Sequence, residues 1–414
     1  MTASTMSASK ERTYDRPTPT LLEKPAAGYN VSIGYLRALI TLMVVAHHAV
    51  LAYHPFAPAA PAALTAVPRW WQAFPVVDLQ RWTGFALFVG FNDTFFMALM
   101  FFLSGLFVWK SLQGKGAGNF VRDRAVRLGV PFVAAAAVIA PLAYYPAYLQ
   151  TGASGIAGFW RQWFSLGNWP AGPAWFVWVL LAFDCIAAGL YLLAPKWGEM
   201  LGRLSSGAER RPILFFAALL GLSAVAYLPL ELIFNGFRWS AWGPFTFQTS
   251  RGLHYLVYFM LGVGVGAYGL GRGLLAAGGK LARRWWLWSL AAVMAFAVSA
   301  GVGIAAMTAH IGSRGWEIAA DSGFVLSCAA SSFAFLAVFV RFAQSRRKLF
   351  DSLTANAYGI YLIHYAFVSW LQYTLLKSHM PAIAKGSLVF MGAVLLSWGA
   401  TAALQRIPAV ARVI

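Results

Sequence analysis

Long apolar runs, each about as long as a membrane-spanning helix, recur along this chain and are separated by short segments of Pro, Gly or charged residues. Because backbone groups inside a bilayer must hydrogen-bond internally, these runs predict helices. The candidate spans are 31–53, 84–109, 129–149, 174–194, 212–234, 252–271, 285–309, 321–343, 355–376 and 385–406. The pattern predicts an all-α integral membrane protein, with a bundle of about ten transmembrane helices over residues 31–414.

Composition agrees with this pattern. Of the 414 residues, 60% are hydrophobic and 11% are charged, and the mean hydropathy is +0.63. Soluble domains carry about 25% charged residues. The predicted spans leave no room for a separate large soluble domain. Residues 1–30 are polar and have no apolar signal core, so they predict a disordered cytoplasmic tail.

The net charge of +19 comes from 32 Lys and Arg against 13 Asp and Glu. If the N-terminus is cytoplasmic, the larger share of the bases falls in cytoplasmic loops, which predicts that both termini are cytoplasmic. Basic loops between spans meet membrane lipids or anionic substrates, so no nucleic-acid partner is expected. The cysteines, Cys185 and Cys328, lie inside apolar spans and suggest neither a disulfide framework nor a metal site.

The first predicted span carries an arginine and a histidine that share one helical face. Arg37 and His48 are separated by eleven residues, which closes three turns and rises roughly 16 Å. A charged residue inside a membrane span is costly and marks a candidate functional site. Alternatively, Arg37 extends to lipid headgroups and His48 is a packed, hydrogen-bonded histidine. We interpret the pair as candidate catalytic residues.

Two polar positions of the second predicted span are candidate substrate-binding residues. Asp93 is expected to orient a histidine or accept from a substrate hydroxyl, although a cap at a broken helix explains it equally well. Ser104 and Gly105 form a small pair that either allows close helix packing or supplies a hydroxyl to a site.

Four further residues are candidate binding groups. Arg124 and Arg127 lie three residues apart at a predicted membrane boundary, and such a fork of guanidiniums suits phosphate, although topology signals use the same composition. Tyr361 and His364 have the same spacing and form a polar patch that could line a cavity or bond to another helix. The acidic residues Asp184 and Glu231 have no partner that the sequence identifies.

Two other patterns have simpler explanations. Aromatic residues crowd the loops predicted on the side opposite the N-terminus, as at 70–71, 159–164 and 239–242, which is typical of an interfacial belt or of a surface that stacks on sugars. The segment 264–269 spells the glycine pattern of dinucleotide-binding folds but follows no strand, so Gly262 and Gly266 are expected to serve close helix packing.

With these residues identified, the chain resembles the membrane-bound acyltransferase-3 family, which includes polysaccharide O-acetyltransferases and periplasmic glucan succinyltransferases. Arg37 to His48 is similar to the family's motif of Arg, ten residues and His. Residues 101–105 look like its FFxxSG segment, 124–127 like its RxxR, and 358–364 like its late YLxH segment. Gly34 stands where members often have an acidic residue.

The resemblance implies an inner-membrane enzyme that moves acetyl, succinyl or a similar short acyl group from cytoplasmic acyl-CoA to a hydroxyl of a carbohydrate or lipid-linked glycan. No bound cofactor is expected, because acyl-CoA is the donor substrate. His48 would be the general base and Arg37, Arg124 and Arg127 would contact the donor. The alternative is a secondary transporter or flippase with Arg37, Asp93, His48 and His364 along its pathway. No repeat relates 30–210 to 211–414, which favours the enzyme.

Overall fold

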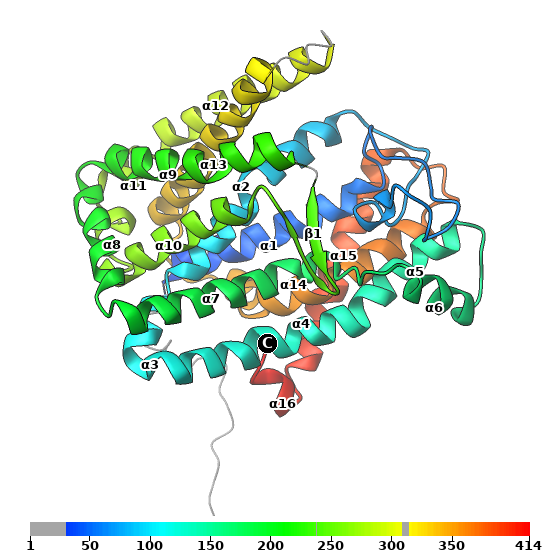
Figure 1. Cartoon of the computed structure of the whole chain (residues 1–414), viewed down its shortest axis with the longest axis horizontal. Coiled ribbons are helices and arrows are strands. Elements are labelled where there is room, and N and C mark those ends of the chain that lie inside the picture. The colour runs from blue at the N-terminus through cyan, green and yellow to red at the C-terminus, as the bar shows by residue number, and fades with distance from the viewer. Residues whose placement is uncertain (1–29, 237, 309–313) are drawn as a thin grey trace, which may run out of the picture.

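The computed structural model describes residues 30–236, 238–308 and 314–414 (Figure 1). The predicted tail at 1–30 lies outside this part except for Asn30. Most of the described chain is helical. The longer helices are α1 (Val31–Leu51), α2 (Gly84–Gly105), α3 (Val108–Arg124), α5 (Ala140–Gln150), α7 (Trp175–Leu193), α9 (Pro212–Phe234), α10 (Gly252–Tyr268), α12 (Trp285–Thr308), α13 (Arg314–Phe342), α14 (Lys348–Thr374) and α15 (Ala382–Leu404).

Short elements connect these helices. They are α4 (Val130–Ala134), α6 (Ile156–Phe164), α8 (Trp197–Ser206), α11 (Lys280–Arg283) and α16 (Pro408–Ala411), with single 3-10 turns at Trp70–Gln72, Gly172–Ala174, Gly207–Glu209 and Gly273–Leu275. Strands β1 (Trp239–Trp242) and β2 (Phe245–Gln248) form an antiparallel ribbon in which Trp239 pairs with Gln248. The ribbon turns at Gly243, which has a φ of 58°. Hydropathy did not predict this ribbon, because its strands are short and aromatic.

The all-helical membrane architecture is confirmed. Within the described residues, 8 helices are long and apolar enough to span a bilayer, or 9 if α10 and the segment Gly273–Arg283, bent by 80° from it, count as one span. Helix α14 is not among them, since polar residues such as Asp351, His364 and Gln372 are spread along its length. It nevertheless packs between α1 and α15. Within the described residues the structure thus supports 8 or 9 spans, against the predicted ten.

Several boundaries differ from the predicted ones. The second span ends at Gly105, and the third belongs to a bent helical run, Val108–Gln150, that starts well before residue 129. Two π-helical turns, Ala125–Gly129 and Ala135–Ile139, lie inside this run. The run is kinked at Gly116, whose φ of 73° is not helical, and each π turn inserts an extra residue, which often bends a helix. The polar segment around Arg124 is therefore helical, and hydropathy alone placed the start of this helix too late.

Helix α1 is held at its start by side-chain contacts. The Asn30 side chain caps it by accepting from the Ile33 amide at 3.1 Å, and the Asn30 amide donates to the Leu270 carbonyl at 3.0 Å. Ser32 donates to the Ala343 carbonyl at 2.9 Å. These bonds join the start of α1 to the ends of α10 and α13. We call this end of the bundle, with the segments 194–211, 269–284 and 343–347, the basic end.

The opposite end is built from aromatic loops. Hydrogen bonds join three loops there, 52–83, 151–174 and 238–251. The Leu64 amide donates to Gln162 Oε1 at 2.8 Å, and the Trp169 amide donates to the Gly243 carbonyl at 3.2 Å. We call it the aromatic end. In Figure 1, α8 and α11 lie at the left, and α6 lies at the right with the blue loops after α1. Because the long helices run alternately between the two ends, α1 starts and α15 finishes at the basic end.

Glycines bring α2 and α10 into backbone contact. A Cβ atom added to any of three glycines would overlap a backbone carbonyl oxygen of the other helix. The overlaps are Gly262 with Phe102, Gly266 with Leu106, and Gly105 with Phe259. Small residues allow helices to approach this closely in membranes. The close-packing role predicted for Gly262 and Gly266 is confirmed, and the tight seam fixes α2 in the middle of the bundle.

Candidate active site

Two histidines from different helices lie side by side inside the bundle. His48 is in the last turn of α1 and His364 is in the middle of α14. His364 Nε2 lies 3.2 Å from His48 Nδ1, and the ring centroids are 5.2 Å apart. The sequence indicated both residues as candidates but gave no reason to pair them. The close packing of α1 against α14 brings them together.

Backbone carbonyls determine which ring nitrogens carry protons. His364 Nδ1 lies 2.7 Å from the Tyr361 carbonyl oxygen, and His48 Nδ1 lies 2.9 Å from that of Val44. A carbonyl oxygen can only accept, so each Nδ1 is a donor. The single His48 Nδ1–H is therefore shared between the Val44 carbonyl oxygen, at 2.9 Å, and His364 Nε2, at 3.2 Å. This assignment leaves the lone pair of His48 on Nε2, the nitrogen available to take a proton.

Helix α14 also holds the backbone and ring of His48. Gln372, which is 1% exposed, donates to the carbonyl oxygen of His48 at 2.8 Å and to that of Ala49 at 3.1 Å. The Tyr365 ring meets the His48 ring edge-on at 4.9 Å. These contacts restrict the imidazole to one orientation, which a general base needs.

A cavity of about 530 Å³ opens at the basic end, between α1, α2, α3, α7 and α14. It brings together five of the residues predicted from the sequence: Arg37, Ser104, Arg124, Arg127 and Tyr361. The segment Ala411–Ile414 covers part of it. In Figure 1 the red helix α16, just before this C-terminal segment, lies below α4.

Cations outnumber acids on the cavity wall. The cationic residues are Arg37, Lys115, Arg124, Arg127 and Arg412, and the acidic residues are Asp123 and Asp184. Each acid lies beside a cation: Asp123 is 2.5 Å from Lys115, and Asp184 is 3.3 Å from Arg124 Nε. The excess of guanidiniums suits a ligand with several phosphates.

Sequence analysis did not assign Lys115, Asp123 or Arg412 to the site, and it named Asp184 without a partner. Lys115 and Arg412 stand in polar segments like many other bases of the chain, so no local pattern distinguishes them. Asp184 did give a signal, since it is an acid inside an apolar run, but its partner lies on another helix. Interhelical pairs of this kind follow from the packing order, which hydropathy does not report.

Tyr361 connects the cavity to the histidine pair. Its ring is part of the cavity wall, and its centroid is 6.0 Å from that of His364, one helical turn further along α14. The hydroxyl donates to the Pro173 carbonyl. His48 and His364 themselves are not cavity-lining residues in the described part of the chain. Tyr361 therefore stands at the inner limit of the cavity.

Asp93 lies apart from this cavity. It pairs with Arg251 at 2.7 Å, and Arg251 is 8% exposed and stacks over the Phe324 ring at 4.7 Å. The Asp93 side chain is 46% exposed. The interpretation of Asp93 as a cap is wrong, because α2 continues without a break from Gly84 to Gly105. Asp93 and Arg251 instead form a polar group toward the aromatic end.

The remaining titratable residues give no metal centre. No group of three His, Cys, Asp or Glu side chains suited to a metal occurs in residues 30–236, 238–308 and 314–414. His54, in the loop after α1, accepts from the Phe56 amide at 3.2 Å. Burial, and then the nearby Arg81 guanidinium, lower the pKa of His54. It is a loop residue without a catalytic partner among the described residues.

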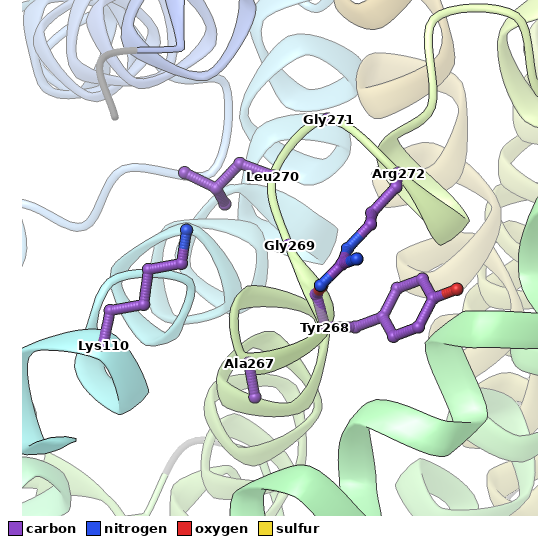
Figure 2. A pocket seen from close by; sticks show the side chains of 7 residues that line it. All are labelled: Lys110, Ala267, Tyr268, Gly269, Leu270, Gly271 and Arg272. Carbon is purple, nitrogen blue, oxygen red and sulfur yellow. The ribbon is translucent and has the colours of Figure 1, made fainter. Parts of the chain in front are cut away.

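A second pocket, of about 340 Å³, lies beside the loop after α10 (Figure 2). It is formed by Lys110 and residues 267–272. Figure 2 shows the Lys110 ammonium near Leu270, while the Arg272 guanidinium covers the Tyr268 ring at 4.8 Å. Its lining holds no histidine or carboxylate among the described residues, so it lacks the acid–base groups of the first cavity.

Comparison with known proteins identifies the family. A family model described as an acyltransferase domain matches residues 30–402, which is most of the chain and includes every candidate site residue. No curated protein and no solved structure matches the chain. A model that covers this much of the sequence, together with the helical membrane fold, is sufficient for assignment: the chain belongs to the acyltransferase-3 family and is a multi-pass membrane acyltransferase.

Proposed function

We propose that this acyltransferase moves a short acyl group, such as acetyl or succinyl, from cytoplasmic acyl-CoA to a hydroxyl of a carbohydrate or lipid-linked glycan. One observation carries the proposal. The arginine-lined cavity ends at Tyr361, one helical turn from the His48–His364 pair. An anion-binding cavity that leads toward a base suits a long donor, with phosphates at one end and a thioester at the other.

The donor enters from the basic end. Its phosphates contact Arg37, Arg124 and Arg127, whose planar guanidiniums bind phosphate oxygens in pairs. The excess of Lys and Arg in the segments at this end supports a cytoplasmic location for it, with both termini on the same side. On this arrangement the pantetheine arm runs from the arginines toward Tyr361.

The reaction needs one proton shuttle. His48 Nε2 takes the proton of the acceptor hydroxyl as its oxygen attacks the thioester carbonyl carbon, and the C–O bond forms. The C–S bond then breaks, and the leaving thiolate takes the proton back from the His48 imidazolium to give the free thiol of CoA. His364 Nε2 accepts from His48 Nδ1–H throughout and stabilises the positive charge that His48 acquires.

The oxyanion needs a hydrogen-bond donor, and each candidate hydroxyl would have to turn its single O–H away from the backbone carbonyl that it now contacts. Ser104 donates to the Met100 carbonyl of its own helix at 2.9 Å, and Tyr361 donates to the Pro173 carbonyl. Tyr361 is the better candidate because its ring is beside His364. Removing one oxyanion donor costs about 10²–10³ in kcat in enzymes that have been tested.

The acceptor approaches from the aromatic end. The polar pair Asp93–Arg251 and the exposed aromatic side chains of this end, such as Trp242 at 65% exposure, support a hydroxyl-rich ligand. A carbohydrate or lipid-linked glycan has both the hydroxyls and the apolar C–H faces that such a surface binds. This location keeps acceptor and donor on opposite sides of His48.

The test compares the glycans and lipids of cells that carry the wild-type protein, His48→Ala, or His54→Ala as a matched control. We expect a mass increase of one acyl group on a glycan or glycolipid with the wild type and His54→Ala, and none with His48→Ala at equal membrane abundance. Acylation that persists in His48→Ala overturns the proposal. Proteoliposomes that accumulate solute without an acyl donor would establish the transporter alternative instead.

A further inference from the structure

Asp184 is an acid buried in an otherwise apolar helix. Helix α7 holds no other charged side chain between Trp175 and Leu193, and the Asp184 side chain is 1% exposed. Placing an ionisable side chain at such a position is costly, and these residues usually face a cavity or a partner. Asp184 does both, since it lines the arginine cavity and lies beside Arg124.

The contact with Arg124 leaves hydrogen-bonding capacity unused. Arg124 Nε is 3.3 Å from Asp184 Oδ2, and the guanidinium also stacks over the Phe120 ring at 5.1 Å. Neither carboxyl oxygen of Asp184 has a hydrogen-bond partner among the described residues. A carboxylate offers about four lone-pair positions. A buried acceptor of this kind is costly unless a ligand or another polar group satisfies it.

An acid opposes the function of a cavity that binds phosphates. Arg37, Arg124 and Arg127 attract anions, whereas a carboxylate on the same wall repels them. The carboxyl group of Asp184 instead suits a part of the donor that carries N–H or O–H groups. The pantetheine arm of CoA has two amide N–H groups and one hydroxyl.

The position of Asp184 along α7 fits that arm. Leu180 and Phe176 line the same cavity, four and eight residues before Asp184, so Phe176 lies roughly 12 Å further along the helix. The Phe176 ring meets the Tyr361 ring at 5.6 Å. Asp184 therefore lies beside Arg124, and Leu180 and Phe176 continue the cavity wall from it toward Tyr361, so an extended donor with its phosphates on the arginines would pass Asp184 with the start of its arm.

We propose that Asp184 accepts a hydrogen bond from an N–H or O–H of the pantetheine arm, and so selects donors that carry this arm. The inference rests on the proposed function, since it assumes that the cavity binds acyl-CoA. It assigns Asp184 a direct contact with the donor. The competing explanation is that Asp184 only holds Arg124 in place for the phosphates. The proposed contact affects binding of the pantetheine arm, whereas the competing role affects binding of the phosphates.

Two ligands separate these explanations: CoA, which has the arm, and adenosine 3′,5′-bisphosphate, which carries phosphates without it. Calorimetry with the full chain in nanodiscs measures Kd for both with the wild type, Asp184→Ala, Asp184→Leu, Asp184→Asn and Arg124→Gln. Cys185→Ala is the matched control, because Cys185 is the next residue of α7 and is exposed outside the cavity. It should leave both Kd values unchanged.

We expect Asp184→Ala to raise the Kd of CoA about 10-fold or more and to change that of the bisphosphate less than about 3-fold. Arg124→Gln should weaken both ligands alike. Asp184→Asn keeps an acceptor oxygen and should retain most of the CoA affinity, whereas Asp184→Leu, which has a similar volume and no acceptor, should repeat the Asp184→Ala result and covers the case that Asp184→Ala does not fold. Equal losses for both ligands in Asp184→Ala and Asp184→Leu, or no loss in them, overturn the inference. A wild type that binds neither ligand contradicts the proposed function itself.

Discussion

His364 Nε2 lies 3.2 Å from His48 Nδ1, and this contact joins the one polar position of the last turn of α1 to the middle of α14. The partner of a catalytic histidine is more often a carboxylate. A neutral imidazole that accepts through Nε2 gives the same orientation and tautomer without bringing a buried negative charge into the membrane. The pair therefore predicts a specific kinetic effect.

Replacing His364 should lower kcat and leave donor binding unchanged. His364→Ala removes the side-chain acceptor of His48 Nδ1–H and leaves only the Val44 carbonyl, so the His48 imidazolium loses a stabilising partner and we expect a loss of up to about 10²-fold in kcat. His364→Gln retains an acceptor oxygen and should lose less. The measurements are steady-state kinetics in nanodiscs and the Kd of CoA. Full activity in His364→Ala would show that His48 needs no partner, and a matching loss of CoA affinity would place His364 at the donor instead.

Conservative substitutions at the cavity arginines should affect the donor. Arg124→Lys and Arg127→Lys each keep the charge but lose the planar pair of N–H groups, so we expect the donor KM to rise about 10-fold at similar kcat. Arg122→Lys is the matched control, since Arg122 is exposed on the same helix and does not line the cavity. An equal change in all three variants would mean that topology, and not phosphate binding, explains these bases.

The glycine seam between α2 and α10 should tolerate no side chain. Gly262→Val puts methyl groups where the Phe102 backbone lies, so the helices must separate. Overpacking costs about 1–3 kcal/mol, and more where backbone is displaced. Gly301→Ala on α12 is the control, because open space surrounds that position. Thermal unfolding in detergent should show a lower midpoint for Gly262→Val only. An unchanged midpoint for Gly262→Val would contradict the close packing.

Much of this fold could be predicted, because membrane-spanning helices are recognised by the length of their apolar runs. The eleven-residue spacing of Arg37 and His48 predicted one shared helical face; in the structure Arg37 lines the cavity, and His48 contacts His364 outside it. Helical periodicity gives the face of a residue and its depth. It does not give the identity of the helix that the face meets.

The missed features follow from that limit. Asp184 with Arg124 joins α7 to α3, and the β1–β2 ribbon depends on a local pattern too short for a hydropathy window. Helix α14 carries the second histidine, and the span predicted from it, 355–376, is interrupted by polar residues such as Asn356, His364 and Gln372. Site residues that act across helices become visible only when the packing order of the helices is known.

A buried ion pair at the aromatic end gives the last prediction. Lys385 Nζ lies 2.7 Å from Asp78 Oδ2, and the two side chains are 0% and 3% exposed. The contact ties the loop 52–83 to the start of α15, away from the arginine cavity. Removing one partner leaves a buried charge without compensation, which typically costs 3–5 kcal/mol.

We therefore expect Lys385→Met and Asp78→Leu each to lower the unfolding midpoint strongly, while the double variant recovers part of the loss because neither charge remains. Folded fractions of all three should keep the Kd of the wild type for CoA, since the pair does not touch the cavity. Additive losses in the double variant would show that the two residues act independently. The Asp78 amide also donates to the Ala52 carbonyl at the end of α1. A weaker affinity for CoA in the folded single variants would therefore indicate that a shift of the loop 52–83 also shifts α1 and the cavity.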